Sequence, residues 1–359
     1  MAKNEKKNKD NRRRRLLLLI LLLALTLVVT AFSTYAWFTS NKKVNVDDLN
    51  VDVRAVNGLE ISADAINWGV KIDKDDLISN AWTGQMNQLP TSLGHASSAK
   101  HLNSSNLLDI FEGVVATNCP NGGTDCDNPT YTLTTVQRNE IRCYDKDGSG
   151  NTNESAVPKC TDQHIMAFDI FLKVDRDDTI LYITENAGVF NTSLDDLGIK
   201  NTTRVAFVVQ GNVSSVNYRE DNGPATAQEL RNGEKVIFWE PNYEAHTQTG
   251  ILNALKYYNI TTTDNSSRLA YDGIKATIPS ASPISLDKTN ATDNSNYFEA
   301  VTIDLETNSR VPERKPTGIT LANGVTKIRV YFWVEGNDVD TENTATGSDM
   351  KLNLEFSID

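Results

Sequence analysis

Alternation of apolar and polar residues dominates the chain after residue 48, and it predicts β-strands. The clearest examples are "FDIFLKV" (168–174), "IRVYFWV" (328–334) and "LNLEFSI" (352–358). Successive side chains of a strand point to opposite faces, so each segment is expected to bury one face and expose the other. Further strands are predicted at residues 49–55, 59–63, 179–183, 204–210, 235–239 and 300–305.

The connections between these segments are long and rich in Asn, Thr, Ser, Asp and Gly, and only residues 227–232 and 251–258 predict short helices. Many strands without long intervening helices indicate an all-β fold. We expect an antiparallel β-sandwich of jelly-roll type with long loop insertions. Residues 37–359 are predicted to form one such domain, with an insertion near residues 112–164.

The first 36 residues carry a different pattern. Eight basic and only two acidic residues accompany the Leu-rich run at 16–29. A basic leader before a short apolar core is typical of an export signal, so residues 1–36 are predicted to form a hydrophobic export helix that enters the membrane. The uncharged stretch 16–38 is also long enough to serve as a membrane anchor. Both interpretations place the rest of the chain outside the cell or at its surface.

Small side chains near the end of this stretch predict a signal-peptidase cut. Thr34 and Ala36 occupy the positions three before and one before a cleavage site between Ala36 and Trp37. Ala31 with Ser33 is an alternative pair. Signal peptidase is therefore an expected partner, and the protein stays anchored in the membrane if the leader is not cut.

Charge excludes one class of partner. Without residues 1–36 the chain has 27 Lys and Arg against 45 Asp and Glu, a formal charge of −18. Such a surface repels nucleic acid and anionic membranes. We therefore expect no nucleic-acid binding.

All four cysteines fall within the predicted insertion. In an exported chain such a cluster indicates disulfides, with three possible connectivities. We favour Cys119 with Cys126 and Cys143 with Cys160, because "CPNGGTDC" is a Pro- and Gly-containing loop that can return on itself.

The loop "DKDGSGNTNESA" offers a candidate calcium site. Its alternating oxygen-bearing residues are Asp145, Asp147, Ser149, Asn151 and Asn153. The twelfth position is Ala156 where a calcium loop of the EF-hand type has a bidentate Glu, so an acidic, glycine-containing turn is the competing interpretation. No other cofactor is expected.

No catalytic motif stands out. The chain has no HExxH sequence, no nucleophile elbow and no phosphate-binding loop, and we predict that it is not an enzyme. The histidines are interpreted as scattered residues, with His95 and His101 in solvated loops. An aromatic recognition face for a glycan is an alternative use of Trp239, Tyr243, Tyr331 and Trp333, although burial under a loop is the commoner fate of such side chains.

Three segments resemble the TasA/camelysin-like exported proteins of Gram-positive bacteria. They are the leader ending in "TYAWFTSN", the segment "VNVDDLNVDVRAV" and the terminal hairpin "IRVYFWVEGNDVDTENTATGSDMKLNLEFS". The resemblance implies a dedicated signal peptidase and a secreted jelly-roll domain that polymerises into biofilm-matrix fibres.

The assembly implied by this resemblance is donor-strand exchange, in which an N-terminal strand completes the sheet of the next subunit. The candidate inserting residues are Val44, Val46, Leu49, Val51 and Val53. The alternative is an ordinary first strand that pairs within its own subunit. We therefore expect a self-associating structural protein, with a membrane-anchored adhesin or carbohydrate-binding ectodomain as the second hypothesis.

Overall fold

The computed structural model covers most of the predicted sandwich. The described residues are 49–80, 82, 84–90, 93–115, 130–135, 142–144, 165–191, 199–220, 222–243, 272–275, 284–285, 298–308, 311–336, 338 and 350–359. All of them belong to the second of the two units into which the chain divides, Trp37–Asp359.

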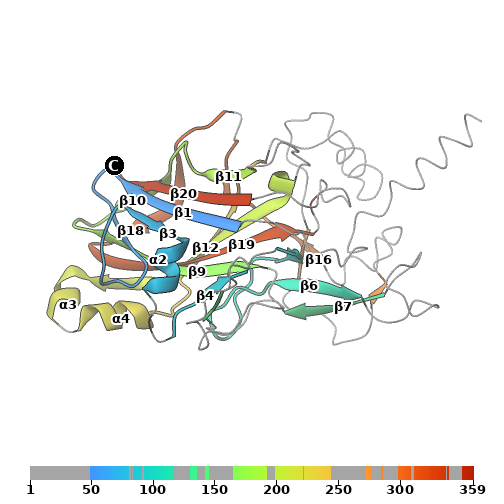
Figure 1. The fold of residues 1–359 in the computed structure, drawn as a ribbon, viewed down its shortest axis with the longest axis horizontal. Helices are drawn as coiled ribbons and strands as arrows, with labels where there is room; N and C mark the ends of the chain where they lie inside the picture. The colour runs from blue at the N-terminus through green and yellow to red at the C-terminus, as the bar shows by residue number, and fades with distance from the viewer. Residues whose placement is uncertain are drawn as a thin grey trace, which may run out of the picture. The chain divides into compact units, whose positions relative to one another are not determined.

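One sheet contains six described strands in the order β18-β10-β20-β1-β3, with β11 also paired to β20 (Figure 1). Their bounds are β1 Leu49–Val56, β3 Lys71–Asp73, β10 Thr179–Ile183, β11 Gly188–Asn191, β18 Lys315–Leu321 and β20 Met350–Ser357. The first and last described strands of the chain therefore lie side by side at the centre of this sheet.

The second sheet contains twelve described strands and is built around β9, β19, β12 and β13. Its strands are β2 Glu60–Ser62, β4 Asn87–Leu89, β5 His95–Ser97, β6 Phe111–Val115, β7 Thr130–Thr135, β8 Arg142–Tyr144, β9 Met166–Val174, β12 Thr203–Ser214, β13 Lys235–Glu240, β15 Ile284–Ser285, β17 Leu305–Glu306 and β19 Gly324–Glu335. Strands β14 (Asp272–Ile274) and β16 (Phe298–Ala300) form a separate pair.

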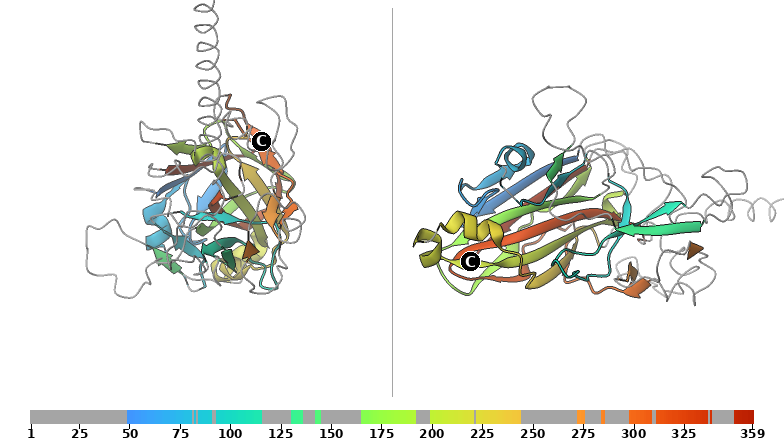
Figure 2. Two further views of the ribbon diagram at one scale, coloured as in Figure 1. Left: turned by 90° about the vertical axis from the view of Figure 1, so that its right-hand side faces the viewer. Right: turned by 90° about the horizontal axis from the view of Figure 1, so that it is seen from below.

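The described helices are short. They are α2 (Lys74–Ser79), α3 (Ser215–Glu220), α4 (Gly223–Glu229) and the 3-10 helix η1 (Ile199–Thr202). Helices α3 and α4 lie together at one end of the sandwich (Figure 2). Within the described part of the chain, no helix has both the length and the apolar character needed to cross a membrane.

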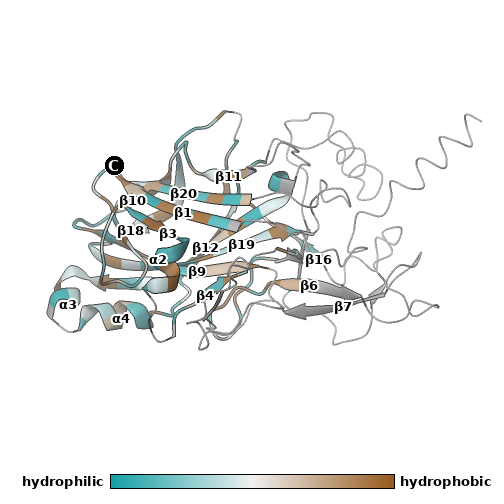
Figure 3. Cartoon of the chain, viewed as in Figure 1, coloured by the Kyte–Doolittle hydropathy of each residue, from teal (hydrophilic) through white to brown (hydrophobic). Residues whose placement is uncertain are grey.

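The two sheets pack face to face and bury one large apolar core. Strands β1 and β20 contribute Val53 and Leu354 to it, and β9, β12 and β19 contribute Ile170, Phe207 and Val330. Figure 3 shows apolar and polar residues alternating along β1 and β20. The predicted all-β sandwich is confirmed, whereas the jelly-roll strand order stays a prediction.

The expectation of purely antiparallel sheets is wrong. Four pairs of the described strands are parallel, namely β1 with β20, β5 with β19, β4 with β8 and β13 with β17. Alternation identifies a strand but carries no information on its direction relative to its neighbour. Both sheets are therefore mixed.

The prediction that each strand buries only one face is also wrong for the central strands of the larger sheet. The outer face of β12, β13 and β19 is covered by a second apolar cluster, which includes Val208, Phe238, Tyr331 and Trp333. Every residue of β19 is buried. Segments far along the sequence, such as Leu107–Leu108 and Ile165, supply the cover, and no local pattern of β19 predicts them.

Two predicted boundaries also differ from the structure. The strand expected at 300–305 is divided into the end of β16 and the start of β17, because Asp304 between them accepts a hydrogen bond from the Phe238 backbone at 2.7 Å. The helix expected at 227–232 is α4, which begins four residues earlier and ends at Glu229. The helix expected at 251–258 lies outside the described residues.

Candidate functional sites

Strand β1 is held by an unbroken register with the C-terminal strand. Eight residue pairs run from Leu49 with Met350 to Val56 with Ser357, in parallel. The side chains of Val51 and Val53 are fully buried between the sheets. Of the candidate donor residues, Leu49, Val51 and Val53 therefore lie in a strand of their own subunit, and Val44 and Val46 lie outside the described residues.

The other edge of β1 is less completely paired. Strand β3 has only three residues and pairs Asp52–Arg54 of β1, and the Ala55 N–H donates to the Val70 carbonyl at 2.9 Å. The turn that follows β1 places Asn57 and Gly58 at φ values of 60° and 84°. Both residue types tolerate this left-handed conformation, which allows the chain to cross to β2 in the other sheet within three residues.

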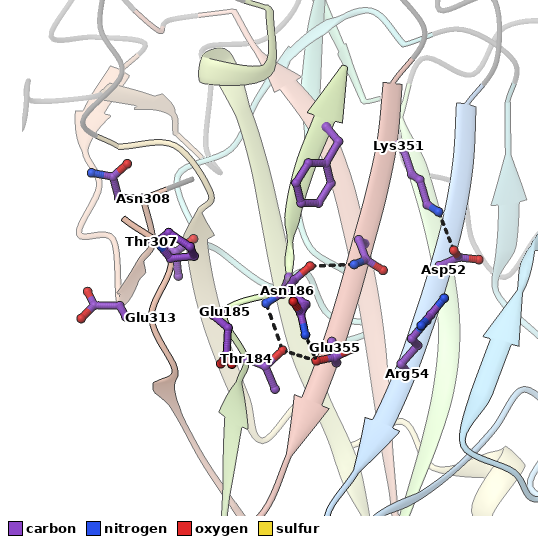
Figure 4. A pocket seen from close by; sticks show the side chains of 14 residues that line it. Asp52, Arg54, Thr184, Glu185, Asn186, Thr307, Asn308, Glu313, Lys351 and Glu355 are labelled. Atoms are coloured by element: carbon purple, nitrogen blue, oxygen red, sulfur yellow. Dashed lines mark hydrogen bonds and ion pairs between the residues drawn. The ribbon is translucent and has the colours of Figure 1, made fainter. Parts of the chain in front are cut away.

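A groove of about 510 Å³ lies on the outer face of the six-stranded sheet (Figure 4). Alternation along the strands places Asp52 and Arg54 of β1 and Lys351 and Glu355 of β20 on this face. Residues 184–187, 307–308 and 312–313 complete the groove. Its residues come from segments that are far apart in the sequence.

A charged pair links the two strands at one end of the groove. Lys351 Nζ lies 2.5 Å from Asp52 Oδ2, and Lys71 Nζ lies 3.6 Å from Asp52 Oδ1. Burial by itself raises the pKa of Asp52, but the hydrogen bond and charge of Lys351, with the charge of Lys71, lower it below its ordinary value. The carboxylate thus remains charged and ties β1 to both neighbours.

Glu355 is anchored on one side only. Its Oε1 accepts hydrogen bonds from Thr184 Oγ1 at 2.6 Å and Asn186 Nδ2 at 2.7 Å, as Figure 4 shows. Asn353 Nδ2 donates to the Asn186 carbonyl at 2.6 Å, while its Oδ1 is buried without a hydrogen-bond partner. The loop after β10 therefore holds a carboxylate and an amide in place while leaving hydrogen-bonding capacity unused.

A second charged cluster is completely buried on the face of the twelve-stranded sheet that points away from the other sheet. Asp169 Oδ1 lies 2.7 Å from Arg329 Nε, and its Oδ2 lies 3.0 Å from Arg329 Nη2 and 3.4 Å from Lys327 Nζ. Burial alone raises the pKa of Asp169, but the charges of Arg329 and Lys327 lower it to about 2. Burial lowers the pKa of Lys327 to about 8, because its effect is larger than the opposite effect of the Asp169 charge.

This cluster joins the sheet to its helical cover. Lys327 Nζ donates to the carbonyl of Gln228 at 2.7 Å and to that of Leu230 at 3.2 Å, at the end of α4. A lysine at a helix C-terminus satisfies carbonyls that have no partner within the helix. We assign Asp169, Lys327 and Arg329 a structural role.

A third buried ion cluster lies at the end of β19. Arg204 Nη2 lies 2.5 Å from Asp338 Oδ2 and 2.9 Å from Glu240 Oε1, and all three side chains are almost completely buried. The Asp338 N–H also donates to the Glu335 carbonyl at 3.2 Å in a turn. This cluster fixes the start of β12 against the ends of β13 and β19.

Most of the other predicted site residues are not covered by the described part of the chain. The cleavage residues Ala36 and Trp37 lie outside it, as do Cys119, Cys126 and Cys160. Cys143 lies in β8, where only the backbone is described. The calcium candidates Asp145, Asp147, Ser149, Asn151 and Asn153 also lie outside the described residues. Their disulfide and calcium assignments stay predictions.

The interpretation of His95 as a solvated loop residue is wrong. His95 belongs to β5, which pairs with β19, and burial lowers its pKa to about 4. His101 lies at the surface and pairs with Glu299. Among the residues that the structure describes, no three His, Cys, Asp or Glu side chains are grouped to hold a metal ion.

The aromatic recognition face expected from four side chains is not formed. Trp239, Tyr331 and Trp333 are each fully buried, and Tyr243 is half-buried beside Lys315. Trp333 donates to Glu335 Oε2 at 2.9 Å, and Trp239 donates to Thr307 Oγ1 at 2.9 Å. Their polar atoms are thus used inside the protein. Tyr331 and Trp333 lie under the second apolar cluster, which covers the face that alternation marked as outward, whereas Trp239 lies in the core between the two sheets.

The described strands define this chain as an all-β sandwich protein with a polar groove on one outer face. No protein-family model, no curated protein and no solved structure matches the chain. The likeness to the TasA/camelysin-like proteins therefore stays a prediction from the sequence segments that carry it.

Proposed function

We propose that this chain is an exported structural protein of the cell surface or extracellular matrix, and that its copies join by exchange of strand β1. The observation that carries the proposal is the position of β1. It is the first described strand after the predicted leader, it lies in an eight-residue register with β20, and it fills the core with Val51 and Val53. A terminal strand can leave and re-enter a sheet without threading the rest of the chain.

When the β1 strand of one copy replaces that of another, the contacts that β1 makes within a single subunit are kept. Burying a valine side chain stabilises a protein by roughly 1.5–3 kcal/mol, so an empty β1 position is strongly unfavourable. The β1 of a second copy restores the same burial and backbone hydrogen bonds. When each subunit donates β1 to one neighbour and accepts β1 from another, the contact is head-to-tail, and it builds an open fibre when the rotation between subunits does not close a ring.

The edges of the six-stranded sheet favour exchange over simple edge-to-edge addition. Strand β3 has three residues with charged ends, Lys71 and Asp73. At the other edge, β18 contains Pro316 and Gly318, whose φ is +79°, and Lys235 Nζ donates to the Gly318 carbonyl. Short, charged or irregular edges oppose the addition of another strand.

The connection to β2 limits the geometry of such a fibre. Only residues 57–59 join β1 to β2, and three extended residues span at most about 10 Å. A short connection between an exchangeable strand and its domain favours swapping, because it leaves the strand little freedom to fold back onto its own subunit. Joined subunits must therefore touch each other directly.

Mixed-chain cross-linking tests the proposal. One full-length chain carries Asp52→Cys and a second carries Asn353→Cys, at positions that pair in the register. Neighbouring strands lie about 4.8 Å apart, which is within reach of a disulfide. Exchange predicts that fibres assembled from the mixture contain peptide 52 of one chain linked to peptide 353 of the other, as identified by mass spectrometry.

A matched mixture replaces Asp52→Cys with Ile180→Cys, an exposed position on the same sheet that does not contact β1. It is expected to give no link to residue 353. Fibres that form without the 52–353 link between chains would rule out β1 exchange, and so would a chain that remains monomeric at all concentrations tested.

A further inference from the structure

The groove on the outer face of the six-stranded sheet has the chemistry of a ligand site. Its volume of about 510 Å³ lies within the range of roughly 300–1,000 Å³ that is usual for small-molecule sites. Figure 4 shows Thr307, Asn308 and Glu313 on one side of it and Lys351, Asp52 and Arg54 on the other. The groove is therefore bounded on two sides.

Hydrogen-bonding groups in the groove are held in place but not fully used. Glu355, which is 9 % exposed, receives two hydrogen bonds on Oε1 and none on Oε2 within the described residues. Arg54 is in register with Glu355 on the adjacent strand, yet its exposed guanidinium makes no hydrogen bond or ion pair there. The Asn353 Oδ1 atom is also unpaired. Buried polar atoms normally have a partner, so the unpaired Asn353 Oδ1 is unusual. Arg54 is exposed and Glu355 Oε2 has an unused acceptor site, so a ligand in the groove would meet all three groups.

A ligand in the groove must both donate and accept hydrogen bonds. Arg54 can only donate, whereas Glu355 Oε2 and Asn353 Oδ1 can only accept. Neighbouring hydroxyl groups satisfy both requirements at once. Phe190, which is 41 % exposed and pairs with Lys351 in the register of β11 and β20, adds an apolar ring at the same groove. An aromatic ring beside polar side chains suits a ligand with one apolar face and polar edges.

Charge restricts the ligand further. Four of the six charged side chains in the groove are acidic, namely Asp52, Glu185, Glu313 and Glu355, and only Arg54 and Lys351 are basic. Phosphates and acidic sugars are disfavoured by this excess of negative charge. Lys351 is already paired with Asp52, so Arg54 is the main cation left for a ligand.

We propose that this groove binds a neutral oligosaccharide. Arg54 donates to ring or hydroxyl oxygens, Glu355 Oε2 accepts from a hydroxyl, and Phe190 packs against the C–H face of a sugar ring. The inference does not rest on strand exchange. In an exchanged fibre the β1 of the neighbour supplies Asp52 and Arg54, and the groove stays complete.

Isothermal titration calorimetry tests this site on the full-length chain in a zwitterionic detergent, since a sugar-headed detergent would compete. The probes are cellohexaose, chitohexaose and a hexamer of galacturonate. At least one of the two neutral hexamers is expected to bind, and the acidic hexamer is expected to bind more weakly or not at all. Phe190→Ala and Arg54→Met are each expected to raise Kd about tenfold or more.

Two matched variants serve as controls. Ile180→Ala removes another exposed apolar side chain from the same sheet, and Arg176→Met removes another exposed arginine; neither residue lines the groove. Both are expected to leave Kd unchanged. The proposal is overturned if neither neutral hexamer binds, if the groove variants bind as well as the controls, or if the acidic hexamer binds most tightly. Fibre formation is measured separately, so the two proposals fail independently.

Discussion

Replacing Asp169 with asparagine is expected to destabilise the protein strongly. The change preserves the size of the side chain but removes the negative charge between Lys327 and Arg329. In the native protein Asp169 makes two close contacts with Arg329, one ion pair with Lys327 and a hydrogen bond from the Met86 N–H at 3.1 Å. An amide has one acceptor oxygen, so it cannot replace all of these interactions.

The expected loss follows from the burial of the cluster. The side chains of Asp169, Lys327 and Arg329 are completely inaccessible to solvent. Removing one partner of a buried ion pair costs about 3–5 kcal/mol, because the remaining charge has neither water nor a counterion. This is a large share of the roughly 5–15 kcal/mol that stabilises a typical domain.

Urea unfolding at pH 7, followed by tryptophan fluorescence, measures this loss. Trp82 is a suitable reporter because its ring lies 4.7 Å from Lys327 Nζ. Asp175→Asn makes the same chemical change at an exposed position just after β9 and is expected to cost less than about 0.5 kcal/mol. A loss at Asp169 that equals the loss at Asp175 would refute the reasoning.

The pH dependence gives a second readout of the same interaction. The pKa of Asp169 falls from 3.8 to about 2 in the folded protein, which corresponds to roughly 2–3 kcal/mol of stability at neutral pH. Because the folded pKa is the lower one, this stability is present above about pH 4 and is lost as the pH falls toward 2. The Asp169→Asn variant is expected to lack this part of the acid-induced loss.

Two further predictions concern backbone conformation and protonation. Gly324→Ala is expected to lower the free energy of unfolding by more than about 2 kcal/mol, because φ is +127° and a Cβ atom would lie 2.1 Å from the Val213 carbonyl oxygen. In Gly58→Ala the new Cβ atom meets no atom within 4 Å, so this change is expected to cost roughly 1 kcal/mol for its φ of +84°. Equal losses in thermal unfolding would contradict this difference. NMR titration of His95 is expected to show a neutral imidazole down to about pH 5, because burial lowers its pKa to about 4. The stability that depends on the neutral form is complete above the unfolded pKa of about 6.5, and it is lost as the pH falls from there to about 4. A midpoint near 6.5 in the folded protein would contradict the burial of this side chain.

The class of fold and the position of most central strands could be predicted from the sequence alone. Alternation at 352–358 identified β20, and the same rule places Lys351 and Glu355 on the face opposite Leu352 and Leu354. This succeeds because the two-residue period of a strand is a local property of the chain. The expected strand at 49–55 was also correct as β1.

Which strands are neighbours, and what covers each face of a sheet, depends on contacts between segments that are far apart in the sequence. Strands β1 and β20 lie at opposite ends of the domain's sequence, so neither segment alone predicts their parallel pairing or the groove across them. The same holds for Tyr331 and Trp333, whose outward direction alternation predicts but whose burial depends on distant residues such as Leu108 and Ile165. Local periodicity records which side chains share a face, whereas long-range packing decides whether that face meets water, a second layer of protein or a ligand.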